Sequence, residues 1–221
     1  MTAMKKLAES DLLSLERYSR ERTDFRARVI AHKKNRQLKV GPNTMWLFED
    51  RLTVHYQVQE MLRAERIFEA EGIAEELEAY NPLIPDGSNW KVTFLIEYPD
   101  SEVRKVQLEK LRGIEDRCWM KVEGLDRVYA IADEDLEREN ETKTSAVHFL
   151  RFELTDAMVA KLKAGAALGV GIDHPEYTHE IAAVSPNVRD ALVADLEAAL
   201  ARSGVPADRF RAMRPGQVVE I

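Results

Sequence analysis

The spacing of apolar residues changes near residue 87 of this 221-residue chain. Before that point apolar positions recur three and four residues apart, which is typical of helices packed on a core. The pattern predicts helices over 10–17, from Asp24 towards Lys39, over 50–68 and over 73–80, and a short strand over 44–48. A Gly41-Pro42 corner separates the second helix from the strand.

Beyond residue 87 strict alternation takes over, first from Trp90 to Tyr98. Further strands are predicted over 117–122, 127–132, 147–154, 168–173 and 177–184, and helices over 101–111, 155–164 and 186–202. We therefore expect an α+β fold in which a helical N-terminal part packs on a largely antiparallel sheet of about five to seven strands, closed by a C-terminal helix. One domain over 1–221 is predicted, helix-rich over 1–87 and sheet-rich over 88–204, with a peripheral tail over 205–221.

Composition and charge indicate the class of protein and its cellular compartment. Hydrophobic residues make up 45% of the chain and the net charge is −7, which is ordinary for a globular protein and disfavours a general nucleic-acid coat. The only cysteine, Cys118, excludes a disulfide within the chain and suits a reducing compartment. The first residues lack the apolar core of a signal peptide, and no apolar run is long enough to span a bilayer. We expect a cytoplasmic protein without membrane contact.

A polar line on the predicted helix over 50–68 is the first candidate site. Val54 and Val58 belong to its apolar arc, whereas Thr53, Gln57 and Glu60 lie between apolar flanks. Polar groups enclosed in this way need hydrogen-bond partners, or each costs roughly 1–3 kcal/mol. As a catalytic set, Glu60 would act as base or ligand while Gln57 and Thr53 position a substrate.

The preceding segment, from Arg17 to Lys39, is strongly basic. It holds nine Lys or Arg and two acids, a charge of +7 in a chain whose total is −7. Here His32 and Arg36 continue an apolar stripe, so a turn through Gly41-Pro42 could bring them to the polar line. An anion site is predicted from four side chains: His32, Arg36, Arg28 and Arg63. The alternative is a solvated basic face that pairs with acids of the same chain.

Metal binding is a third prediction, from residues far apart in the sequence. A divalent metal or iron could be held by His32, Glu49, Glu60 and His174, because imidazole and carboxylate are common ligands. The Asp173-His174 pair also admits a structural turn, since neighbours in a strand face opposite sides. An acidic stretch over 133–141 is predicted to be an exposed loop or frayed turn. No glycine-rich or Walker-type loop supports a nucleotide cofactor.

Several of these motifs together resemble a bacterial family catalogued as a domain of unknown function. They include His32-Lys33-Lys34-Asn35-Arg36, Gly41-Pro42, Phe48-Glu49, the 60–65 run Glu-Met-Leu-Arg-Ala-Glu, the 80–85 run Tyr-Asn-Pro-Leu-Ile-Pro, and Asp173-His174-Pro175. The resemblance covers nearly the whole chain. Genes of that family often stand beside rubrerythrin and an iron–sulfur protein, which implies a part in oxidant handling.

Three functions are therefore expected. The first is a cytoplasmic accessory or ligand-binding protein of a peroxide or redox system, with a rubrerythrin-like or iron–sulfur protein as partner, and a homodimer is compatible with it. The second is a metal-assisted enzyme that uses the Glu, Gln, His and Arg residues of the N-terminal helices. The third is anion or nucleic-acid binding by the basic helix, which the acidic total charge makes the least favoured.

Overall fold

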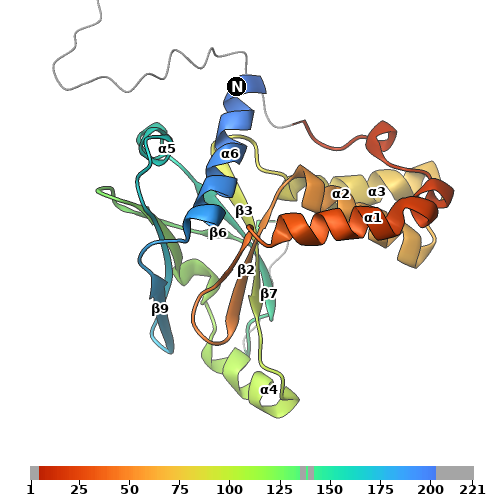
Figure 1. Cartoon of the computed structure of the whole chain (residues 1–221). Helices are drawn as coiled ribbons and strands as arrows, with labels where there is room; N and C mark the ends of the chain where they lie inside the picture. The colour runs from red at the N-terminus through yellow and green to blue at the C-terminus, as the bar shows by residue number, and fades with distance from the viewer. Residues whose placement is uncertain (1–4, 135–137, 139–141, 203–221) are drawn as a thin grey trace, which may run out of the picture.

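Two antiparallel sheets and a bundle of helices make up the fold (Figure 1). The computed structural model describes residues 5–134, 138 and 142–202, with side chains to residue 196. The α+β class and the C-terminal helix are confirmed. The strands, however, divide between a five-stranded sheet in the order β1-β2-β3-β7-β6 and a four-stranded sheet in the order β5-β4-β8-β9. The predicted tail over 205–221 lies outside the described residues.

The helices begin where capping residues are placed in the sequence. Ser14, Asp50, Asp100 and Thr155 each accept hydrogen bonds from backbone N–H groups of the first turn that follows. The helices are α1 (Leu15–Lys33), α2 (Arg51–Glu65), α3 (Ala70–Tyr80), α4 (Ser101–Lys110), α5 (Asp156–Lys163) and α6 (Pro186–Arg202), and the short 3-10 turns are η1 (Glu9–Asp11), η2 (Asn81–Leu83) and η3 (Glu115–Arg117).

The strands of the five-stranded sheet are β1 (Gln37–Lys39), β2 (Thr44–Glu49), β3 (Asn89–Ile96), β7 (Val147–Glu153) and β6 (Ile131–Ala132). Those of the four-stranded sheet are β5 (Arg127–Tyr129), β4 (Cys118–Val122), β8 (Leu168–His174) and β9 (Tyr177–Ile181). The segment predicted as one strand over 127–132 pairs first with β4 and then, past Ala130, with β7. It therefore links the two sheets.

A single large core lies between the two sheets and α5 and α6. Trp90 of β3, Met120 of β4 and Leu192 of α6 belong to it and are at most 1% exposed. The Trp90 indole donates to the Leu192 carbonyl at 3.2 Å, which ties α6 to the five-stranded sheet. Because β3 alternates, the face opposite this core carries Lys91, Thr93 and Leu95.

Helices α1, α2 and α3 project together from one side of the sheets (Figure 1). Val54 and Val58 of α2 are buried in this projection, as predicted, and so is Leu62. Phe68, at the end of the helix predicted over 50–68, is 67% exposed because α2 ends at Glu65, before Arg66 with its left-handed φ of 58°. The predicted basic helix likewise ends at Lys33, and residues 37–39 form strand β1 instead.

Candidate functional site

Glu60 lies in a closed ion pair rather than at an open site. Its carboxylate accepts hydrogen bonds from the Tyr18 hydroxyl at 2.5 Å and from Arg22 at 2.8 and 2.7 Å. The Arg22 guanidinium, followed by the Tyr18 hydroxyl, holds the pKa of Glu60 at about 2 despite the opposing effect of burial. An acid ionised so firmly is a weak base, so this geometry gives Glu60 a structural role.

The other two members of the polar line are separated from Glu60. Thr53 is buried, donates to the Glu49 carboxylate at 2.5 Å and accepts the backbone N–H of Asp50. Gln57 is exposed, whereas Gln59 is fully buried and bonds the backbone of Leu13. The enclosed amide is thus two positions beyond the predicted one, because Leu13, in the segment before α1, covers Gln59.

His32 and Arg36 do meet, but their acid partner is Asp50. His32 Nε2 lies 2.6 Å and Arg36 Nε 3.2 Å from Asp50 Oδ2. Arg36 also forms a double ion pair with Asp195 of α6, at 2.6 and 2.5 Å. Only 5% of the Arg36 side chain is exposed, so this cluster joins the helical projection to α6 as a buried ionic network.

The remaining predicted ligands lie elsewhere. His174 is buried at the end of β8, where its ring contacts the Arg112 carbonyl and accepts the Glu176 N–H, while Asp173 accepts the Tyr129 hydroxyl. The four proposed metal ligands, His32, Glu49, Glu60 and His174, thus have four different sets of partners. Arg28 and Arg63 are exposed on α1 and α2.

A cavity of about 380 Å³ opens on the outer face of the five-stranded sheet, against the end of the helical projection. Its base is formed by β3 and β7, and its other wall by the end of α3 and by η2. The lining residues are Ala79, Tyr80, Pro82, Leu83, Lys91, Glu134, Phe149, Leu150 and Arg151. Most of them are apolar, and the charged ones adjoin one another, because Lys91 is the strand partner of Arg151, which pairs with Glu134.

Lys91 is the distinctive group of this cavity. It lies between Glu49 and Arg151 in the strand register. The Glu49 carboxylate is held by the hydroxyls of Thr53 and Thr93, and Arg151 pairs with Glu134 at 2.7 and 2.6 Å. Within the described residues the Lys91 ammonium makes no hydrogen bond and no ion pair. Burial, and then repulsion from Arg151, lowers the pKa of Lys91 below its ordinary 10.5.

Our sequence predictions missed Lys91. Alternation places Lys91 on the face opposite Trp90, as the structure does. A lysine on such a face is normally interpreted as an ordinary solvated residue. A signal was present in the 80–85 run that carries the family resemblance, because Tyr80, Pro82 and Leu83 of that run line the cavity. A polar strand residue and a distant apolar motif become one site only when the fold brings them together.

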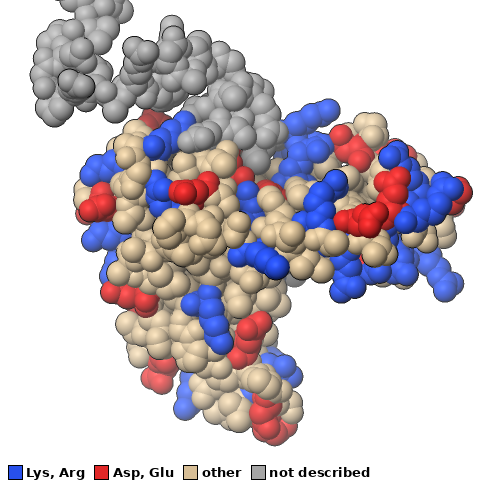
Figure 2. Space-filling model, viewed as in Figure 1, with Lys and Arg blue, Asp and Glu red and all other residues tan. Residues whose placement is uncertain are grey.

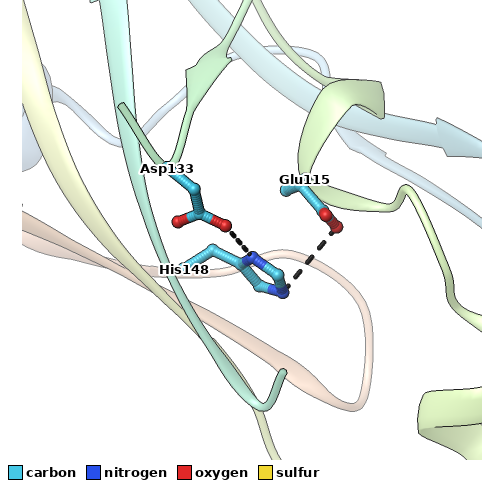
Figure 3. Close-up of side chains that lie close together, drawn as sticks. All are labelled: Glu115, Asp133 and His148. Atoms are coloured by element: carbon cyan, nitrogen blue, oxygen red, sulfur yellow. Dashed lines mark hydrogen bonds and ion pairs between the residues drawn. The ribbon is translucent and has the colours of Figure 1, made fainter. Parts of the chain in front are cut away.

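A second group of polar side chains surrounds His148, which is fully buried on β7 (Figure 3). Its Nδ1 lies 2.6 Å from Asp133 Oδ2, and its Nε2 lies 3.7 Å from Glu115 Oε2. The prediction of an exposed acidic loop is therefore wrong for Asp133, whose side chain is only 10% exposed. Residues 135–137 and 139–141 of that stretch lie outside the description. One ligand atom from each of the three residues falls within 4.8 Å of the others.

The outer face of the four-stranded sheet carries another depression of about 380 Å³. The Trp119 indole lies over Gly171 there, where an added Cβ would come within 2.3 Å of the ring. The Arg127 guanidinium lies 3.9 Å from the indole centre and bonds Asp173. The indole is only 4% exposed beneath this guanidinium, so the depression offers a ligand less apolar wall than the Lys91 cavity.

Comparison with known proteins identifies a family. The family model described as "Protein of unknown function (DUF3501)" matches residues 6–196. A similar solved structure is a protein of unknown function from Burkholderia pseudomallei K96243, with a TM-score of 0.83 and 53% sequence identity over 87% of this chain and 100% of that one. No curated protein matches. Among the described residues no helix is long and apolar enough to cross a bilayer. The chain belongs to the DUF3501 family of proteins of unknown function.

Proposed function

We propose that this protein binds a small organic anion in the Lys91 cavity. The observation that supports the proposal is the half-buried Lys91, which lines the cavity and whose ammonium has no partner among the described residues. A cation partly removed from water loses solvation, and a protein that only needed a stable sheet would gain by an apolar or paired residue here. A ligand anion supplies the missing partner.

The size and lining of the cavity indicate the rest of the ligand. A volume of about 380 Å³ falls within the range of small-molecule sites. Tyr80, Leu83 and Phe149 give an apolar wall for an aromatic or aliphatic body. Among the charged lining residues Arg151 pairs with Glu134 and also with Glu153, which leaves Lys91 as the cation available to a ligand anion. A monocarboxylate with an apolar body matches both features.

A ligand-binding role agrees with an accessory part in a peroxide or redox system. That part, with a rubrerythrin-like or iron–sulfur protein as partner, is supported only by the family resemblance and is proposed on that ground. The cytoplasm is proposed as its location because a single cysteine admits no disulfide within the chain. Affinity capture from native cells would test the partner: we expect co-purification of a rubrerythrin-like protein, and its absence would contradict the association.

Anion binding by the basic helix has weaker support. Positive side chains gather on the helical projection (Figure 2), but three arginines of α1 pair with acids. They are Arg17 with Glu21, Arg20 with Glu16, and Arg22 with Glu60. This pairing fits the solvated-face alternative. Nucleic-acid binding there would require an affinity that falls steeply with salt.

The ligand proposal is tested by melting temperatures in the presence of benzoate, phenylacetate and hexanoate. We expect at least one to raise the melting temperature of the wild type, because a ligand that binds only the native state stabilises it. Lys91→Met, which keeps the bulk of the side chain without its charge, should abolish the rise. Lys121→Met is the matched control, because that exposed lysine of β4 lines the other depression.

A further inference from the structure

We propose that His148, Glu115, Thr144 and the carbonyl of Ser145 form a binding site for one divalent transition-metal ion. The ion would lie at Nε2 of His148, on the side of the ring facing Glu115 in Figure 3. This site is separate from the Lys91 cavity: His148 faces the core from β7, whereas Lys91 faces the opposite side of the same sheet.

Four distances among the donor atoms are close to those of a coordination shell. Nε2 lies 3.0 Å from Thr144 Oγ1, 3.1 Å from the Ser145 oxygen and 3.7 Å from Glu115 Oε2. Thr144 Oγ1 and Glu115 Oε2 are 3.4 Å apart. Ligands bound at about 2.1 Å stand about 3.0–3.4 Å from one another in octahedral or tetrahedral geometry. The donors thus already have nearly the required spacing.

The other side of the ring is held as metal-binding histidines usually are. Nδ1 bonds Asp133 Oδ2 at 2.6 Å, and Asp133 Oδ1 accepts the backbone N–H of Phe149 at 2.9 Å. Arg138 forms an ion pair with the same carboxylate at 3.3 Å. A carboxylate that accepts from the second ring nitrogen fixes the ring orientation and its tautomer, and leaves Nε2 as the ligand. Asp133 is therefore a positioning residue.

The surroundings of Nε2 are rich in oxygen atoms. With its proton on Nδ1, a neutral ring directs the Nε2 lone pair towards the Thr144 hydroxyl, which can donate to it, and towards the Ser145 carbonyl and the Glu115 carboxylate, which can only accept hydrogen bonds. A metal ion placed among these atoms would bind the ring nitrogen and the oxygen atoms together. His148 is 0% and Glu115 7% exposed, so water cannot screen the two groups well.

The donor set indicates the class of ion. One imidazole nitrogen with carboxylate, hydroxyl and carbonyl oxygens suits Mn²⁺, Fe²⁺ or Zn²⁺ better than thiolate-seeking ions such as Cu⁺. The oxygen-rich shell also predicts that Co²⁺ can substitute and serve as a spectroscopic probe. Thr144 is 1% exposed, so the ion would be enclosed by the protein.

The test measures metal binding by the full chain. After chelation and dialysis, titration with Mn²⁺, Zn²⁺ and Co²⁺ should show one ion per chain for at least one of them, with a rise in melting temperature. Glu115→Gln, which keeps the shape of the side chain, should weaken that binding at least tenfold. His148→Gln should abolish it.

The controls separate this site from general effects. His174→Gln removes another buried histidine, one whose ring contacts the Arg112 carbonyl and the Glu176 N–H, and should leave metal binding unchanged. The proposal is overturned if the wild type takes up none of the three ions, or if Glu115→Gln and His148→Gln bind metal as the wild type does. If His148→Gln does not fold, the Glu115→Gln result alone decides.

Discussion

Two charged regions of this protein, the helical projection and the Lys91 cavity, differ in how completely their groups are paired. In the helical projection, Arg36 forms ion pairs with both Asp50 and Asp195, and Glu60 accepts hydrogen bonds from both Arg22 and Tyr18. In the Lys91 cavity, an ammonium of lowered pKa has no hydrogen bond or ion pair within the described residues. Paired buried charges hold a fold together, whereas an unpaired one beside open volume is available to a ligand.

The largest effect is expected from Arg36→Met. The change removes one guanidinium and leaves the carboxylates of Asp50 and Asp195 in a buried setting without it. We expect the free energy of unfolding to fall by about 3–5 kcal/mol, measured by denaturant titration. Arg17→Met is the control, because its pair with Glu21 is exposed and should contribute less than about 1 kcal/mol. Equal losses in the two variants would contradict a structural ionic network.

Glu60→Gln should have a smaller effect that depends on pH. The folded pKa of Glu60, about 2, lies below its ordinary value of 4.5, so its stabilisation is complete above pH 4.5 and is lost as the pH falls towards 2. At neutral pH the variant should lose roughly 1–2 kcal/mol. Between pH 4.5 and 2 the difference from the wild type should shrink. A difference that stays constant over this window would show that the ion pair is not the cause.

Lys91→Met should stabilise the protein slightly while removing ligand binding. The folded pKa of Lys91 is lowered, so its burial costs stability at neutral pH, and the cost is relieved as the pH rises towards 10.5. We expect a gain of roughly 0.5–1 kcal/mol at pH 7, which disappears at alkaline pH. Thermal unfolding at both pH values measures it. A loss of stability at pH 7 would mean that the lysine supports the fold.

Sequence patterns predicted the elements better than the sites. Alternation located β3 and β7, and capping residues located α4 and α5, because these signals are local. The strand over 127–132 was predicted as one piece because nothing in its sequence shows that it changes sheets after Tyr129.

The site residues were harder to predict because their burial and partners depend on contacts between distant segments. Arg36 meets Asp195 across 159 positions, and Leu13 covers Gln59 across 46. A helical pattern shows which face is enclosed but not which segment encloses it, so Gln57 was chosen in place of Gln59. Lys91 and the residues around His148 escaped prediction for the same reason.

The contrast between the paired network and the Lys91 cavity is tested most directly by one set of melting curves. The wild type, Lys91→Met and Glu60→Gln are each heated with and without benzoate, phenylacetate and hexanoate. The account predicts the same ligand-induced rise in the wild type and Glu60→Gln, and none in Lys91→Met. A rise that persists in Lys91→Met, or one that disappears in Glu60→Gln alone, would contradict it.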